Sequence, residues 1–143
     1  MENFFVKIPN VFLEKGEEKV SPKELFLYFH LHYRKLYDWK KTITSIDLLS
    51  QEIKFNNRED RNKKSIKDSL YSLKDKGHIN FSLHHELRYN TLLHITFNEN
   101  FRGFTQIYPV LYKMAENENE FAIFINVNQK VYHRAQLKVD HPV

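Results

Sequence analysis

The stretch from residue 62 to residue 76 constrains the fold of this chain most. Its apolar residues Ile66, Leu70 and Leu73 are spaced four and three apart, so they lie on one face of an α-helix. Gly77 follows directly, where glycine commonly ends a helix. The remaining positions are mostly polar or charged, which predicts a helix over about residues 62–76 with one face in a core and the opposite face in solvent.

The excess positive charge of the chain is confined to this region. Eight basic and four acidic side chains lie between Lys54 and His78, whereas the rest of the 143-residue chain is balanced and the net charge is +4. Clustered basic charge is the electrostatic footprint of a protein that binds a polyanion, and nucleic acid is the first candidate. Charge alone leaves open the alternative of a lysine-rich helix face that only faces solvent.

Two further helix starts precede this segment. Ser21, Pro22 and Glu24 form a capping-box pattern with proline at the first helical position, and the apolar residues that follow predict a buried helix from Pro22 to about Tyr37. A second, weaker start signal predicts a short helix over about residues 45–54.

Two runs of alternating polarity come after Gly77. Their apolar positions are Ile79, Phe81 and Leu83, then Leu93, Ile95 and Phe97. This alternation predicts a β-hairpin with its turn at residues 85–90. The order of helix, helix, basic helix and hairpin is that of a helix-turn-helix with the hairpin as its wing. We therefore expect a mainly α fold of the α+β class.

A family resemblance rests on residues 44–81, TSIDLLSQEIKFNNREDRNKKSIKDSLYSLKDKGHINF, which look like helix 2, the recognition helix and the first wing strand of a winged-helix domain. The opening FFVKIPNVF, followed by SPKELFLYFHL, resembles the N-terminal domain of Gram-positive plasmid replication initiators and related phage and primosome proteins of the DnaD type. The resemblance spans roughly residues 4–98.

The resemblance implies a winged-helix DNA-binding domain at residues 1–100, with residues 101–143 as a C-terminal extension. Its expected function is sequence-specific binding of double-stranded DNA in replication initiation or regulation, without catalysis or a cofactor. A homodimer in the cytoplasm is expected, with replication or transcription proteins as further partners.

Candidate contacts follow from the same resemblance. The start of the recognition helix would approach the major groove, where arginine and lysine contact guanine edges or phosphates. Tyr71 would touch a phosphate or sugar, or else pack against the wing, and Asn62 and Ser65 would cap the helix or contact phosphate. The full candidate set is Arg58, Arg61, Asn62, Lys63, Lys64, Ser65, Lys67, Tyr71, Arg88 and Tyr89.

Acidic residues on the same predicted face depart from a purely electrostatic account. Asp68 and Asp75 would repel phosphate, unless Asp68 accepts a hydrogen bond from a cytosine amino group or pairs with Lys64 at i, i+4.

The C-terminal part carries an echo of the N-terminal part. Residues 104–111 resemble residues 5–12, and residues 120–125 resemble residues 24–29. This indicates a partial second winged helix or a dimerisation element, with chance similarity as the alternative. The alternation in residues 121–127 suits a strand, whereas the echo favours a helix. We expect a helix that packs on the first domain or on a second subunit.

Two rival functions come from other classes. A winged helix can serve as a protein-interaction module, for instance in helicase loading. His30 and His32, with Tyr71 and Lys74 as Tyr-x-x-Lys, resemble motifs of rolling-circle nucleases of the HUH type, which need both histidines on one face of a strand. The predicted helix would instead separate His30 and His32 by about 200°.

Metal, disulfide and membrane chemistry are not expected. The chain has no cysteine, so it lacks disulfides and thiolate metal ligands, and His84, His85 and His94 are interpreted as surface histidines rather than a metal site. No apolar run approaches the length of about 18 residues that a membrane span needs, and the N-terminus does not resemble a secretory signal.

Overall fold

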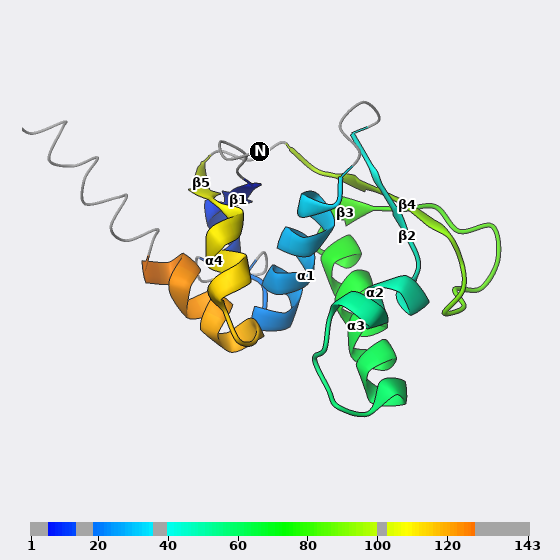
Figure 1. Ribbon diagram of the computed structural model, residues 1–143. Coiled ribbons are helices and arrows are strands. Elements are labelled where there is room, and N and C mark those ends of the chain that lie inside the picture. Colours follow the sequence, from blue (N-terminus) through cyan, green and yellow to red (C-terminus); the bar gives the residue numbers. More distant parts are fainter. Residues whose placement is uncertain (1–5, 14–18, 36–39, 100–102, 128–143) are drawn as a thin grey trace, which may run out of the picture.

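The computed structural model describes residues 6–13, 19–35, 40–99 and 103–127, which form an α+β fold (Figure 1). The elements in chain order are β1 (Val6–Pro9), the 3-10 helix η1 (Asn10–Phe12), α1 (Pro22–Tyr33), β2 (Thr42–Thr44), α2 (Ile46–Glu52), α3 (Glu59–Asp75), β3 (Ile79–Asn80), β4 (Leu93–Phe97), β5 (Phe104–Ile107) and α4 (Pro109–Met114). Residues 118–127 are also helical. In the part of the chain described, every helix is too short or too polar to cross a membrane.

Local capping signals set the starts of α1 and α2, as the sequence predicts. The Ser21 hydroxyl accepts a hydrogen bond of 3.2 Å from the Glu24 amide, and the Ser45 hydroxyl accepts one of 3.2 Å from the Leu48 amide. Both bonds satisfy amides that have no partner inside the helix. The ends differ slightly from expectation, since α1 ends at Tyr33 and α2 at Glu52.

Gly77 ends α3 in the left-handed conformation, with φ of 79°. The Gly77 amide donates to the Lys74 carbonyl and the His78 amide donates to the Leu73 carbonyl, both at 2.9 Å. These two bonds form the Schellman arrangement that closes many helices. The predicted helix end is therefore confirmed.

The start of α3 differs from the prediction. The helix begins at Glu59, three residues before Asn62, and Arg58 is its N-cap without a side-chain hydrogen bond. Asn62 is inside the helix and has no exposed surface. Its side-chain oxygen accepts from the Phe55 amide at 2.7 Å, and its side-chain nitrogen donates to the Ile53 carbonyl at 2.8 Å. Asn62 thereby fixes the loop between α2 and α3.

A three-stranded antiparallel sheet has the strand order β2-β4-β3. Thr42 of β2 is opposite Ile95 of β4. Ile79 of β3 is opposite Phe97 of β4, so the predicted pairing of the hairpin strands is confirmed. Its first strand is shorter than expected, because β3 has only two residues. Directly after β3, the Lys74 ammonium donates a hydrogen bond of 2.7 Å to the Phe81 carbonyl. Residues 81–92, called the 81–92 loop below, connect β3 to β4.

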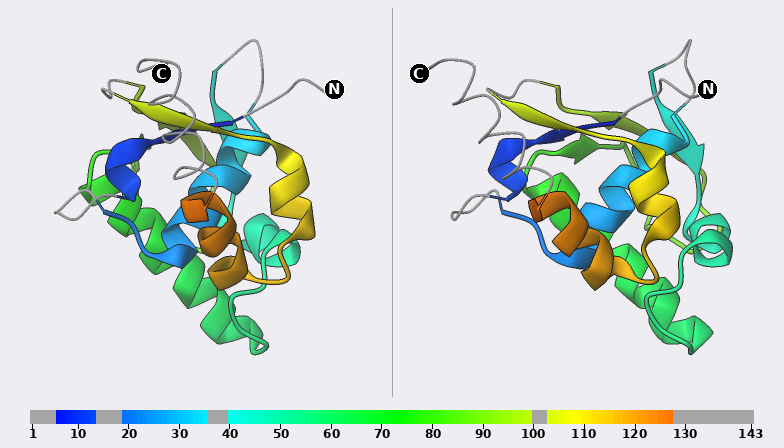
Figure 2. Two further views of the ribbon diagram at one scale, coloured as in Figure 1. Left: turned by 90° about the vertical axis from the view of Figure 1, so that its left-hand side faces the viewer. Right: turned by 60° about the vertical axis from the view of Figure 1, so that its left-hand side comes forward.

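A second sheet pairs the two segments that echo each other in sequence. β1 and β5 run antiparallel, with Val6 opposite Ile107 and Pro9 opposite Phe104. Figure 2 shows these strands side by side, with α4 and helix 118–127 flanking α1. The Asn10 amide donates a hydrogen bond of 2.9 Å to the Gly103 carbonyl, which extends the contact between these two segments beyond β1 and β5.

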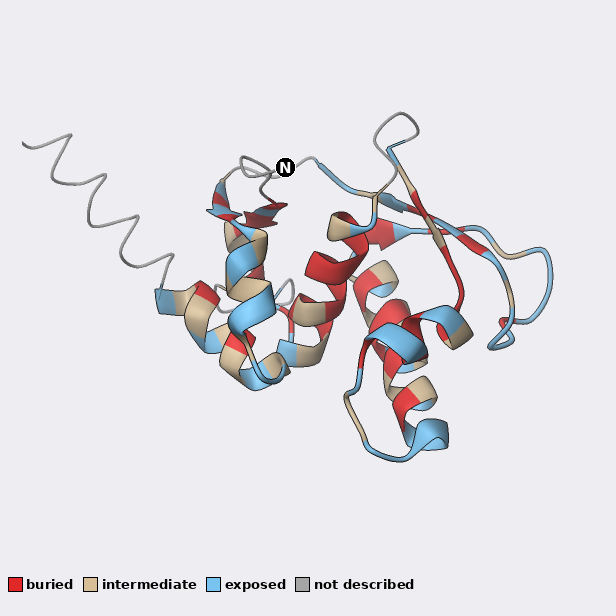
Figure 3. Cartoon of the chain, in the orientation of Figure 1, coloured by how far each residue is buried: buried red, intermediate tan, exposed pale blue. Residues whose placement is uncertain are grey.

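The core surrounds α1, which is buried along most of its length (Figure 3). On one side α2 and α3 pack against it, and on the other side lie residues 103–127, called the C-terminal segment below. Phe121 and Ile125 are fully buried, and the Phe121 ring lies 5.1 Å from that of Phe29 between centroids. The helical interpretation of residues 121–127 is confirmed, and the C-terminal segment shares one hydrophobic core with the rest of the fold.

Candidate nucleic-acid interface

The face of α3 that points away from the core carries several cations. Ile66, Leu70 and Leu73 are fully buried on the opposite face, and this places Arg61 and Lys64 in solvent, with Lys67 half-buried beside them. Among the residues that the structure describes, these three cations form no ion pair. Their charges can therefore be directed to phosphates or base edges.

Lys63 differs from its neighbours, because two carboxylates already surround it. Its ammonium nitrogen lies 3.0 Å from Asp47 Oδ1 and 3.3 Å from Glu59 Oε1. The hydrogen bond to Asp47, which has the larger effect, and the hydrogen bond to Glu59 raise the pKa of Lys63 above its usual value. The ammonium also lies 5.8 Å from the centroid of the Tyr89 ring.

Three other candidates near the start of α3 have different surroundings. Arg58 is exposed, and its guanidinium lies 3.1 Å from the Asp60 carboxylate. Ser65 is half-buried on the flank of the helix. The prediction that Asn62 contacts DNA is wrong, since it is buried and both ends of its carboxamide are bonded within the protein.

Tyr71 is half-buried on the side of α3 that faces the 81–92 loop. The centroid of its ring lies 6.3 Å from that of Phe81, the buried first residue of this loop. The contact agrees with the packing alternative for Tyr71.

The 81–92 loop ends in a tight turn that presents two candidate residues. The Thr91 amide donates to the Arg88 carbonyl at 3.1 Å, and the Arg88 amide donates to the Thr91 hydroxyl at 2.9 Å. Arg88 and Tyr89 are both exposed. The Tyr89 carbonyl accepts from the Asp47 amide at 2.9 Å, which attaches the turn to the start of α2.

Acidic side chains interrupt the basic surface. Asp68 and Asp75 are exposed on the outward side of α3 together with Arg61 and Lys64. Of the two alternatives for Asp68, the ion pair with Lys64 does not form in the described part of the chain. The surface therefore has mixed charge, and the exposed carboxylate of Asp68 can accept a hydrogen bond from a ligand.

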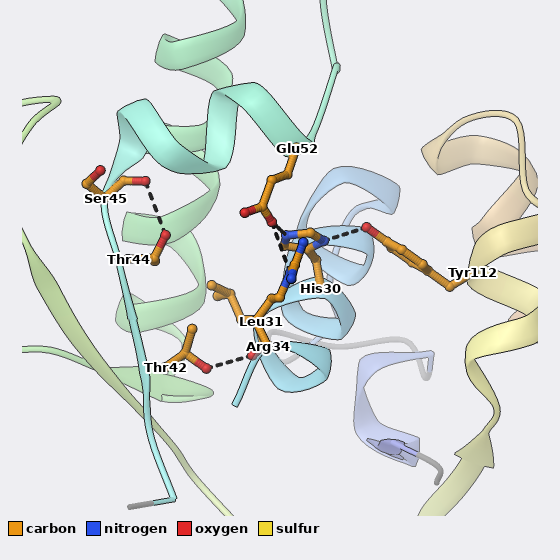
Figure 4. Close-up of polar contacts among 8 residues, drawn as sticks. All are labelled: His30, Leu31, Arg34, Thr42, Thr44, Ser45, Glu52 and Tyr112. Atoms are coloured by element: carbon orange, nitrogen blue, oxygen red, sulfur yellow. Dashed lines mark hydrogen bonds and ion pairs between the residues drawn. The ribbon is translucent and has the colours of Figure 1, made fainter. Parts of the chain in front are cut away.

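A polar cluster around the buried His30, which the sequence did not indicate, joins three helices (Figure 4). His30 Nε2 lies 2.5 Å from Glu52 Oε2, and Arg34 Nε donates to the same oxygen at 3.2 Å. His30 Nδ1 is hydrogen-bonded to the Tyr112 hydroxyl. Burial lowers the pKa of His30, although Glu52 opposes this effect, and burial raises the pKa of Tyr112 to about 12. No spacing pattern connects residues 30, 52 and 112, so only the fold could reveal the cluster.

The second histidine of the His-x-His motif points into different surroundings. His32 Nε2 is 3.1 Å from the Tyr28 hydroxyl, and its ring centroid lies 3.8 Å from that of Phe97. Burial lowers the pKa of His32 to about 3. Because His30 and His32 belong to α1 and contact separate partners, the strand geometry of an HUH nuclease is not formed here. Within the described residues, no three histidine, aspartate or glutamate side chains are grouped to hold a metal ion.

No protein-family model matches this chain, and comparisons with curated proteins and with solved structures found no significant match. The functional assignment therefore depends on the geometry of the chain itself.

Proposed function

We propose that this protein binds double-stranded DNA sequence-specifically through a winged helix, as a cytoplasmic replication-initiation or regulatory protein of plasmid or phage type. The observation that carries the proposal is a set of cations on the solvent side of α3, opposite a fully buried apolar face. These cations are Arg61, Lys64 and Lys67, and none of them is ion-paired within the part of the chain described. In this proposal α3 is the recognition helix.

The arrangement of the elements supports the proposal. The order α1-β2-α2-α3-β3-β4, with a sheet of order β2-β4-β3, agrees with a helix-turn-helix followed by a wing. The 17 residues of α3 make a rod about 25 Å long, and the major groove of DNA is wide enough to admit a helix. The 81–92 loop would be the wing, with Arg88 reaching an adjacent groove or the phosphate backbone.

The mixed charge of α3 suits recognition of particular bases rather than of phosphate alone. Arginine and lysine can donate to guanine, and an exposed carboxylate such as that of Asp68 can accept from the cytosine amino group. A homodimer would present two recognition helices to two half-sites. The C-terminal segment supports such an assembly through its exposed apolar residues, which are Val110, Met114, Ile123 and Val127.

The first experiment is selection of bound sequences from random DNA duplexes, followed by affinity measurement at several salt concentrations. A palindromic consensus supports dimeric, sequence-specific binding. Replacing Arg61, Lys64 and Lys67 together by glutamine should weaken binding, because fewer phosphates are neutralised. The slope of log K against log[salt] should become less negative by about 1 for each phosphate that is no longer neutralised.

A matched control carries the same change in charge elsewhere. The triple glutamine variant of Lys19, Lys23 and Lys113 alters no residue of α3 or the 81–92 loop, and it should bind DNA with nearly the affinity and salt slope of the unchanged protein. Equal losses of affinity in both variants, or unchanged affinity in the α3 variant, would remove the recognition-helix assignment.

A protein-docking module is the second candidate function. It is favoured by Leu48 on α2 and Leu92 before β4, which are 47% and 59% exposed. Equal affinity for all duplex sequences, together with loss of binding to a protein partner in a Leu48→Ser and Leu92→Ser variant, would favour docking over DNA recognition.

A further inference from the structure

Three elements meet at Asp47, the second residue of α2. Its carboxylate accepts from the Lys63 ammonium of α3 at 3.0 Å, and its backbone amide donates to the Tyr89 carbonyl in the 81–92 loop at 2.9 Å. The Lys63 ammonium also lies over the Tyr89 ring. Lys63, Asp47 and Tyr89 thus form a closed set of contacts between α2, α3 and the loop, called the loop clamp below.

Lys63 is poorly suited to bind phosphate directly. Its side chain is 20% exposed, and the Asp47 and Glu59 carboxylates balance its charge. A phosphate approaching it would meet two nearby negative groups. Lys64, the next residue, is exposed and has no ion pair within the described chain, so the two adjacent lysines have different environments.

We propose that Lys63 is a positioning residue that fixes the 81–92 loop relative to α3, rather than a DNA contact. The inference rests on the proposed function, because its consequence is that α3 and Arg88 can reach DNA together in one fixed geometry. It also assigns Asp47 and Tyr89 to the loop clamp.

The Asp47 amide provides a direct readout of the loop clamp without DNA. An amide in the first turn of a helix has no acceptor within the helix, so its protection from hydrogen exchange comes from the Tyr89 carbonyl. Lys63→Gln should accelerate exchange at Asp47 by about tenfold through local opening of the loop. Lys63→Arg should restore slow exchange, because a guanidinium can still bridge both carboxylates.

Measurements of DNA affinity distinguish a positioning role of Lys63 from a direct contact with phosphate. Lys63→Gln should weaken binding and leave the salt slope unchanged, whereas Lys64→Gln should make the slope less negative by about 1 and leave Asp47 exchange unchanged. Asp47→Asn removes the carboxylate charge but keeps the backbone amide, so it should also accelerate exchange at residue 47, while the amides in the middle of α3 stay as protected as in the unchanged protein.

The opposite pattern overturns the inference. If Lys63→Gln makes the salt slope less negative as Lys64→Gln does and Asp47 exchange stays slow, Lys63 is a phosphate contact. If the unchanged protein binds no duplex, the proposed function fails, but the exchange rates of the Lys63 and Asp47 variants still decide whether the loop clamp exists.

Discussion

His30 Nε2 lies 2.5 Å from Glu52 Oε2, so a buried imidazole on α1 joins the last residue of α2. The other imidazole nitrogen is hydrogen-bonded to the Tyr112 hydroxyl on α4. One side chain thereby connects the C-terminal segment to the helix that precedes α3. The C-terminal segment is thus linked through His30 to α1 and to the end of α2.

The first prediction concerns this connection. His30→Leu removes the partner of the Tyr112 hydroxyl and one of the two partners of the partly exposed Glu52 carboxylate, and should lower the free energy of unfolding by about 1–2 kcal/mol. Tyr112→Phe removes only one hydroxyl and should cost about 1 kcal/mol. Urea denaturation measures both, and equal stability of His30→Leu and the unchanged protein would contradict the structural role.

The second prediction is a loss of stability in acid. Burial lowers the pKa of His32 from 6.5 to about 3, so between these values the unfolded chain binds more protons than the folded chain. Stability is therefore greatest above the unfolded pKa and falls as the pH decreases toward 3. A drop from pH 7 to pH 5 should cost about 2 kcal/mol from His32 alone, and the lowered pKa of His30 acts in the same direction.

A His32→Gln variant is the control for this pH dependence. Glutamine can still bond the Tyr28 hydroxyl but does not titrate, so its stability should fall less steeply between pH 7 and pH 5. Urea denaturation at each pH measures the slope, and identical slopes in the two proteins would exclude His32 as the titrating group.

The third prediction concerns Asn62. Asn62→Ala leaves the Phe55 amide and the Ile53 carbonyl without their hydrogen-bond partner, and should cost about 2–4 kcal/mol of unfolding free energy. Ser65→Ala, one turn further along α3, should change stability by less than about 0.5 kcal/mol. Thermal or urea unfolding compares the two variants, and similar small effects would show that Asn62 does not hold the loop.

The fourth prediction concerns Gly77. A Cβ at this position meets no atom within 4 Å, so any cost of Gly77→Ala comes from the left-handed backbone with φ of 79°. Alanine there should lower stability by about 1 kcal/mol, whereas Gly77→Asn should cost less because asparagine tolerates this conformation. Urea denaturation midpoints rank the stability of the unchanged protein, Gly77→Asn and Gly77→Ala. An alanine variant as stable as the unchanged protein would contradict a cost of the left-handed backbone at residue 77.

Much of the fold follows from features that act over a few residues. Ser21, Ser45 and Gly77 set helix boundaries through bonds to neighbours within five positions. The spacing of Ile66, Leu70 and Leu73 determines which side of α3 is buried. These relationships could be predicted because capping and periodicity depend on nearby sequence.

The sequence by itself determined the three helices before the hairpin, the buried face of α3 and the cluster of cations opposite it. Only the tertiary structure decided which candidate residues are exposed to solvent. It buried Asn62 in the loop before α3, paired Lys63 with Asp47, and joined His30 to Glu52 and Tyr112. Hydrogen bonds and ion pairs of this kind depend on distances between segments far apart in the chain, and those distances are set when the common core packs.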